Sequence, residues 1–136
     1  MQVIWRFLGG KPRLEDWLNR PCSPTVEQGP RPNDRRDRFE TVVAVESAGE
    51  PEPRGPHRRI ARAIFAYEVF PPTLVSPVLL RSPLQAGEIV GILLHLLPGI
   101  HLFCGACVLE CFDEPRNGVW RSGFTYRTLA GHPELG

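Results

Sequence analysis

Three apolar runs separated by turn residues dominate the C-terminal half of the chain. Pro98-Gly99 separates the first run from the second, and 114–118 (EPRNG) separates the second from the third. Asn-Gly is a strong hairpin signal because both residues tolerate positive φ. The runs are 87–97 (GEIVGILLHLL), 100–113 (IHLFCGACVLECFD) and 119–129 (VWRSGFTYRTL). They predict a three-stranded antiparallel meander with strands near 88–97, 101–113 and 118–129.

Residues 57–70 (HRRIARAIFAYEVF) carry the strongest helical pattern. Apolar side chains recur at helical spacing along one side, and charged side chains lie largely elsewhere. The apolar set is Ile60, Ala63, Ile64 and Tyr67, and the charged set is Arg58, Arg59, Arg62 and Glu68. Pro71-Pro72 predict the end of this helix, because proline cannot donate a backbone hydrogen bond and restricts the residue before it.

The first 56 residues predict less regular structure. Residues 12–20 (PRLEDWLNR) predict a short helix whose apolar stripe consists of Leu14, Trp17 and Leu18. Residues 39–45 (FETVVAV) have the β-branched enrichment of a strand. We therefore expect one domain overall. Its irregular N-terminal segment, 1–56, holds a short helix and one strand, and its remainder, 57–136, holds a helix and antiparallel strands.

Composition narrows the class of protein. The chain has 136 residues, of which 42% are hydrophobic and 23% charged, as in one globular domain. A formal net charge of +1 gives no overall attraction to nucleic acid or to an anionic membrane. No stretch reaches the ~20 apolar residues of a membrane span. The N-terminus lacks a basic leader and a cleavage site, so we expect a cytoplasmic protein with reduced cysteines.

The most specific motif lies at the C-terminus and reads Gly-Phe-x-Tyr-x-Thr-Leu-x-Gly-His-Pro-Glu-x-Gly. It is formed by Gly123, Phe124, Tyr126, Thr128, Leu129, Gly131, His132, Pro133, Glu134 and Gly136. This motif resembles the signature of the family called domain of unknown function nineteen-ninety. Ala63 and Tyr67 of the helix, the Phe-Pro break at 70–72 and the Gly-led strand at 87–91 are similar to that family as well.

The resemblance implies an α+β fold of the START-like helix-grip type. In that fold an antiparallel sheet curves around a long C-terminal helix, helices pack on one face of the sheet, and an apolar cavity lies between them. The family's last strands and gripping helix would follow Gly136, so we expect a fold that is incomplete at the C-terminus. An uncovered apolar sheet face is unfavourable in water, which predicts a homodimer through that face or a fragment of a longer protein.

Four polar residues of the signature are the candidate ligand-binding residues: Tyr126, Thr128, His132 and Glu134. On a strand, Phe124 and Tyr126 share one face, and their apolar rings predict that this face points inward. The residues from Gly131 to Glu134 predict a turn, which places His132 and Glu134 at the mouth of a cavity. In the structural alternative, His132 and Glu134 hydrogen-bond the turn and Tyr126 belongs to the core.

A second pattern combines His101 with Cys104, Cys107 and Cys111. Cys-x-x-Cys spacing occurs in metal and redox sites, where His101 would be a fourth ligand. The run is apolar, however, and on a regular strand Cys104 and Cys107 point to opposite faces. We predict that the three cysteines are strand residues with no bound metal.

These observations favour a non-catalytic START-like protein that binds a small apolar or amphipathic ligand without a cofactor. No nucleotide-binding loop and no hydrolase or metalloprotease motif is present in the sequence. Two alternatives remain open. One is an enzyme that uses His132 for acid/base chemistry together with Glu134, Tyr126 or Thr128. The other is a small metal or redox module at Cys104 and Cys107.

Overall fold

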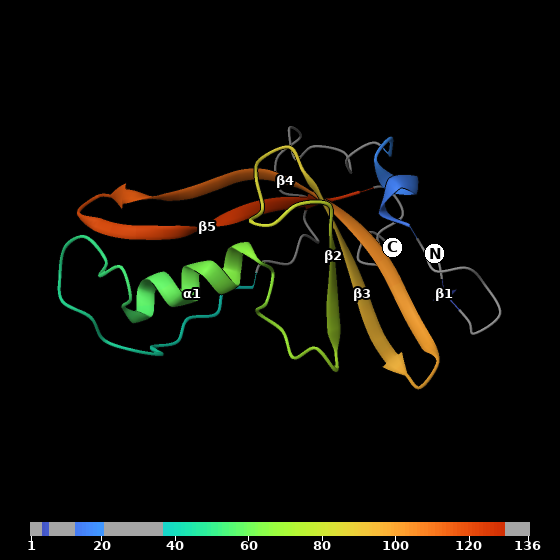
Figure 1. The fold of residues 1–136 in the computed structure, drawn as a ribbon, viewed down its shortest axis with the longest axis horizontal. Helices are drawn as coiled ribbons and strands as arrows, with labels where there is room; N and C mark the ends of the chain where they lie inside the picture. The colour runs from blue at the N-terminus through green and yellow to red at the C-terminus, as the bar shows by residue number, and fades with distance from the viewer. Residues whose placement is uncertain (1–3, 6–12, 21–36, 130–136) are drawn as a thin grey trace.

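A computed structural model describes residues 4–5, 13–20 and 37–129, which form one antiparallel sheet, one α-helix and one 3-10 helix (Figure 1). The strands are β1 (Ile4–Trp5), β2 (Val75–Leu79), β3 (Ile89–Leu97), β4 (Ile100–Arg116) and β5 (Val119–Thr128). The helices are the 3-10 helix η1 (Leu14–Trp17) and the α-helix α1 (Pro56–Phe65). Strand order is β1-β4-β3-β2, and β5 also pairs with β4. The predicted α+β class is confirmed.

The three predicted C-terminal strands are confirmed as β3, β4 and β5, and all their pairings are antiparallel. Asn117 and Gly118 both have positive φ, at 54° and 77°, as a two-residue hairpin turn of the predicted kind requires. Gly99, in the turn between β3 and β4, has a φ of 75°. The long C-terminal helix of a helix-grip fold is not among the described residues, where α1 precedes β2 to β5 in the chain.

Strand β4 changes its neighbours halfway along its length. Its inner half, 100–108, pairs with β3 through residues 100–107 and with the end of β5 through residues 106–108, whereas its outer half, 109–116, pairs with β5 but not with β3. A register shift between Val108 and Glu110 interrupts the β4–β5 pairing where the outer half begins. Figure 1 shows the consequence: β2 and β3 extend in one direction, and the β4–β5 hairpin extends in another with α1 alongside.

Both faces of the inner half are covered. One face belongs to the Tyr67 cluster, which comprises Tyr67, Val75, Leu84, Val90, Ile92, Cys104, Ala106 and Val108. The other belongs to the Trp17 cluster, which comprises Leu14, Trp17, Phe103 and Leu129. The ring of Trp17 lies 5.5 Å from that of Phe103 in an edge-on arrangement, so η1 covers this face. The predicted helix at 12–20 is thus confirmed in position, although among the described residues 13–20 only 14–17 are helical.

The prediction that the second helix extends to Phe70 is wrong. Helix α1 ends at Phe65 because Tyr67 adopts a left-handed conformation, with φ of 58°. The backbone N–H of Glu68 donates to Ala63 and that of Tyr67 donates to Ile64, a Schellman arrangement that closes the last turn. Tyr67 is only 4% exposed, so burial of its ring offsets the unfavourable backbone geometry.

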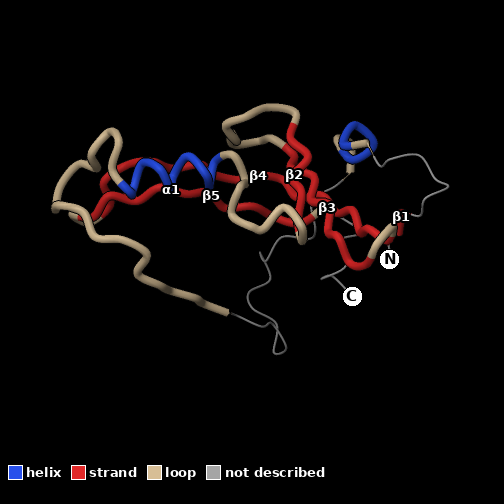
Figure 2. The backbone as a smooth tube through the Cα atoms, turned by 60° about the horizontal axis from the view of Figure 1, so that its bottom comes forward, coloured by secondary structure: helices blue, strands red, loops and turns tan. Residues whose placement is uncertain are grey.

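The prediction of a strand at 39–45 is also wrong. This segment is an exposed loop with no strand assignment, and it lies apart from the sheet in Figure 2. Phe39 is 92% exposed, so the segment buries little apolar surface among the described residues. Strand β2, in contrast, was not predicted, because Pro77 lies at its centre. Proline is tolerated there because, among the described strands, β2 is an edge strand that pairs with β3 alone.

Candidate functional site

The structure describes two of the four candidate ligand-binding residues, and both lie on β5. Tyr126 pairs with Val108 and Thr128 pairs with Ala106 of β4. Phe124 and Tyr126 share a face as predicted, since their rings lie 5.8 Å apart. Tyr126 is nevertheless 46% exposed and lies at the margin of the core. His132 and Glu134 lie outside the described residues, so the convergence of all four side chains stays a prediction.

The three cysteines of the second pattern all lie on β4, as predicted. Cys104 belongs to the Tyr67 cluster, and Cys107 packs against the Trp17 cluster on the opposite face. The Cys111 thiol donates to the backbone carbonyl of Leu84 at 3.4 Å. Burial raises the pKa of the Cys111 thiol, and the nearby carboxylates of Glu88 and Glu110 add to that rise. This arrangement favours packing thiols, because they do not converge on one point.

A polar network that the sequence analysis missed joins α1 to the β4–β5 hairpin, and its centre is Asp113. One carboxylate oxygen, Oδ1, accepts from the Ser122 hydroxyl at 2.5 Å and from the Trp120 indole N–H at 2.7 Å. The other, Oδ2, accepts from Nη1 of Arg58 at 2.5 Å. The hydrogen bonds from Ser122 and Trp120, followed by the charge of Arg58, hold the pKa of Asp113 below its ordinary value.

The network continues to the N-terminus of α1. His57 Nε2 lies 2.8 Å from the Ser122 hydroxyl. The backbone N–H of His57 donates to the Glu46 carboxylate at 3.0 Å, and that of Glu52 donates to the same carboxylate at 2.5 Å. These two bonds lower the pKa of Glu46. A helix leaves backbone N–H groups unpaired at its start, and a carboxylate can accept from them. Glu46 therefore already occupies the place at the N-terminus of α1 where an anion would bind.

The order of groups in the network argues against an activated serine. In a serine–histidine–aspartate triad, the imidazole lies between the hydroxyl and the carboxylate and removes the hydroxyl proton. Here the Ser122 hydroxyl lies between His57 and Asp113 and donates its proton to the carboxylate. His57 is therefore the donor to Ser122. The network holds α1 against the hairpin, and its order of groups does not let His57 remove the Ser122 proton.

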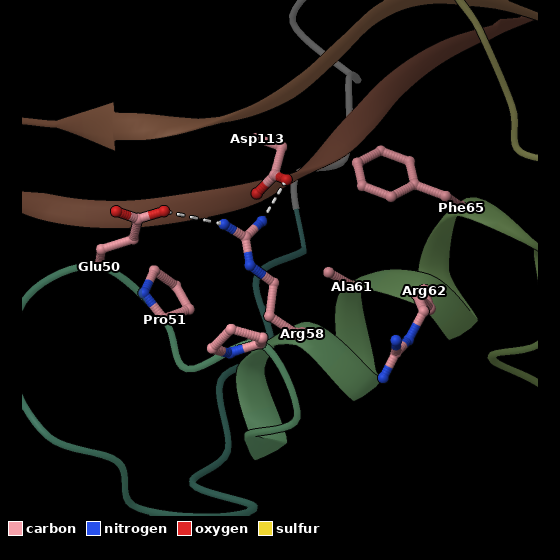
Figure 3. Close-up of a pocket in the computed structure, with 8 residues that line it drawn as sticks. Glu50, Pro51, Arg58, Ala61, Arg62, Phe65 and Asp113 are labelled. Atoms are coloured by element: carbon pink, nitrogen blue, oxygen red, sulfur yellow. Dashed lines mark hydrogen bonds and ion pairs between the residues drawn. The ribbon is translucent and has the colours of Figure 1, made fainter.

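A cavity of about 350 Å³ opens beside this network, between α1 and β4 (Figure 3). Figure 3 shows the Arg58 side chain pointing from α1 toward the carboxylates of Glu50 and Asp113. Two carboxylates thus balance the charge of Arg58. The guanidinium of Arg62 has no hydrogen bond or ion pair with any described residue. The lining residues are Glu50, Pro51, Pro53, Arg58, Ala61, Arg62, Phe65 and Asp113.

Part of this network follows from a local signal in the sequence. Counting outward from the two-residue turn at Asn117-Gly118 places Asp113 opposite Ser122, and the structure has this register. Trp120 and Ser122 then share a face of β5, because side chains alternate along a strand. The contribution of α1 carries no such signal, since His57 lies 65 residues before Ser122.

Comparison with known proteins places the chain in a family. The family model described as Domain of unknown function (DUF1990) matches residues 22–136, so the chain belongs to this family. The resemblance predicted from the C-terminal signature is therefore confirmed. No curated protein and no solved structure matches the chain. In the described part of the chain, no helix is both long enough and apolar enough to cross a membrane.

Proposed function

We propose that this member of the family is a non-catalytic binding protein that takes a small amphipathic ligand between α1 and the sheet. The observation that carries this proposal is the cavity of about 350 Å³ at that position. Its volume falls within the range of small-molecule sites, roughly 300–1,000 Å³. A ligand held between a helix and a curved antiparallel sheet also fits the START-like function that the family resemblance implies.

The lining supports an amphipathic ligand over a purely apolar one. Pro51, Pro53, Ala61 and Phe65 supply apolar surface for a ring or a short acyl chain. Arg62 supplies a guanidinium that is not engaged by any described residue. Guanidinium groups bind carboxylate, sulfonate or phosphate oxygens through strong charge-assisted hydrogen bonds. The proposed ligand therefore has an apolar body and one anionic group.

The probe that tests this function is 8-anilinonaphthalene-1-sulfonate, which joins fused apolar rings to one sulfonate. We expect saturable binding of one molecule per chain, followed by fluorescence. Arg62→Gln should weaken binding about tenfold, the effect of one lost charge-assisted hydrogen bond of about 1.4 kcal/mol. Phe65→Ala should also weaken binding, because it removes apolar lining.

Arg59→Gln is the matched control, because Arg59 is an exposed arginine of the same helix that does not line the cavity. Near-UV circular dichroism must show native packing in each protein, since this probe also binds loosely packed states. Equal affinities for wild type, Arg62→Gln and Phe65→Ala would overturn the proposal. A second experiment, mass spectrometry of the protein purified without denaturation, searches for a small amphipathic molecule that accompanies it.

A further inference from the structure

Two histidines face each other near the turn of the β3–β4 hairpin, which lies away from α1 in Figure 1. His95 and His101 are direct partners in the antiparallel register of β3 and β4. Their Nδ1 atoms lie 2.8 Å apart, and their rings are perpendicular with centroids separated by 4.8 Å. Both rings are half-buried. Two imidazoles on neighbouring strands thus bring one ring nitrogen each within hydrogen-bond distance of the other.

A single proton lies between the two Nδ1 atoms. At 2.8 Å they form a hydrogen bond, so one nitrogen donates and the other presents its lone pair. The Ser76 hydroxyl of β2 lies 2.8 Å from Nε2 of His95 and can either accept from it or donate to it. Either tautomer of His95 is therefore compatible with the pair. The bridging proton can leave Nδ1 for Nε2 of the same ring, which frees the lone pairs of both Nδ1 atoms for a metal ion.

The spacing of these nitrogens matches one edge of a metal coordination sphere. Imidazole nitrogen binds first-row metals at about 2.0–2.1 Å, so two ligands at right angles lie about 2.9 Å apart. Two ligands at the tetrahedral angle lie about 3.3 Å apart. The observed 2.8 Å fits the right angle. Square-planar and tetragonal nitrogen sites are the preference of Cu(II) and Ni(II), and Cu(II) binds tightest in the series.

We propose that His95 and His101 form a two-imidazole site for a divalent transition-metal ion, with Cu(II) bound most tightly and Ni(II) next. Ser76 is the positioning residue that holds the His95 ring through Nε2, as outer hydrogen-bond partners do in metal sites. No third histidine, cysteine, aspartate or glutamate joins the pair among the described residues. Water or an external ligand completes the coordination.

The surroundings leave room for those additional ligands. The pair opens onto a surface pocket of about 440 Å³. Pro72, Thr73, Leu96, Leu97 and Pro98 line the pocket together with the two histidines. Its apolar walls shield one side of the ion, while the open side admits water. The site is therefore distinct from a closed structural zinc site, which uses four protein ligands.

Calorimetric titration of the full chain with copper sulfate, and separately with nickel chloride, tests the site. We expect one Cu(II) ion per chain, weaker Ni(II) binding, and an electron paramagnetic resonance spectrum with coupling to two nitrogens. His95→Gln and His101→Gln should each weaken Cu(II) binding at least about tenfold, because one of two anchoring bonds is lost. Ser76→Ala should weaken binding less and retain both nitrogen couplings, because it removes only a positioning contact.

The chain has four histidines, so His57→Gln and His132→Gln provide the matched controls. Both should bind Cu(II) like wild type. Wild-type affinity in His95→Gln or His101→Gln would overturn the proposal, and so would an equal loss in a control. If near-UV circular dichroism shows that a variant is not folded, the electron paramagnetic resonance spectrum of the wild-type protein is the test. Coupling of Cu(II) to fewer than two nitrogens in that spectrum would reject the site.

Discussion

The two halves of β4 belong to one strand but are stabilised in different ways. In the inner half, Phe103, Cys104, Gly105 and Ala106 are all buried in succession, because both faces of the sheet are covered. In the outer half, polar residues recur instead, and β5 is the only strand that pairs with it among the described residues. These polar residues are Glu110, Asp113, Glu114 and Arg116.

The inner half therefore contributes mainly to the stability of the fold, whereas the outer half holds the polar groups beside the cavity. A strand segment buried on both faces, such as 103–106, needs apolar or small side chains at every position, which leaves no polar group in that segment to meet a ligand. The outer half keeps one face for α1 and exposes the rest, so it can hold Asp113 and the cavity beside it. Interactions there are partly solvated and individually weaker. The proposed ligand site thus lies where the core contributes least.

The largest expected effect contrasts two phenylalanines of β4. Phe103 is 1% exposed and packs against Trp17, so Phe103→Ala should lower the free energy of unfolding by about 3–5 kcal/mol. Phe112, in the outer half, is half-buried, so Phe112→Ala should cost about 1–2 kcal/mol. Urea denaturation followed by circular dichroism measures both. Equal losses would contradict the division of β4 into two environments.

Two glycines sharpen the same contrast. A Cβ atom added at Gly105 would lie 2.8 Å from Cε3 of Trp17 and 3.1 Å from Leu129. Gly105→Ala should therefore destabilise the protein by about 1–3 kcal/mol, as overpacking of a core does. At Gly123 on β5, the added atom would lie 3.0 Å from Cζ of Phe112, a half-buried ring that can shift. Gly123→Ala should change the midpoint of thermal unfolding only slightly, and a larger loss there than at position 105 would refute this interpretation.

Removing the charge of Asp113 tests the network of the outer half. Its carboxylate has a lowered pKa, so its stabilising contribution is present above the unfolded-state pKa and is lost as pH falls through the folded-state pKa. Because more than a third of the side chain is exposed, Asp113→Asn should cost only about 0.5–1 kcal/mol at pH 7. The difference between wild type and variant should shrink below about pH 4.

Urea denaturation at neutral pH and at acid pH measures this difference. Glu114→Gln is the control, because Glu114 is an exposed residue of the same strand that pairs with Arg116. It should change stability less than Asp113→Asn does. A difference for Asp113→Asn that stays constant down to acid pH would show that the variant acts through packing and that the carboxylate charge contributes nothing.

The β4–β5 hairpin could be predicted because its information is local. Asn117 and Gly118 specify the turn, and side-chain alternation then defines which residues share a face. The end of α1 could not be predicted, because a tyrosine in the left-handed region is unfavourable in isolation. Only the buried environment of the Tyr67 ring, formed by residues distant in sequence, favours that geometry. Helix α1 therefore ends before it reaches the prolines at 71–72, which do not determine its C-terminus.

In the candidate site, too, only the features that depend on local sequence could be predicted. Tyr126 and Thr128 were assigned to the correct strand, since the apolar pattern of β5 is local. The network around Asp113 depends on where α1 packs, and Arg58 looked like one charge of a solvated helix face. The prediction of a strand at 39–45 is wrong for a related reason. β-Branched residues favour a strand only when a partner edge and a buried face are available.

The smallest expected effect concerns that exposed segment. Val42 is 84% exposed, and threonine keeps its branched shape while replacing one methyl group with a hydroxyl. Val42→Thr should therefore change the free energy of unfolding by less than about 0.5 kcal/mol. A homodimer that buries the segment predicts the opposite: Val42→Thr would lower Tm, and Tm would rise with protein concentration. Thermal unfolding of both proteins at a low and a high concentration separates the two cases. Because folding of a monomer is unimolecular, a Tm that is independent of concentration and equal in both proteins would mean that residues 39–45 remain solvated in solution.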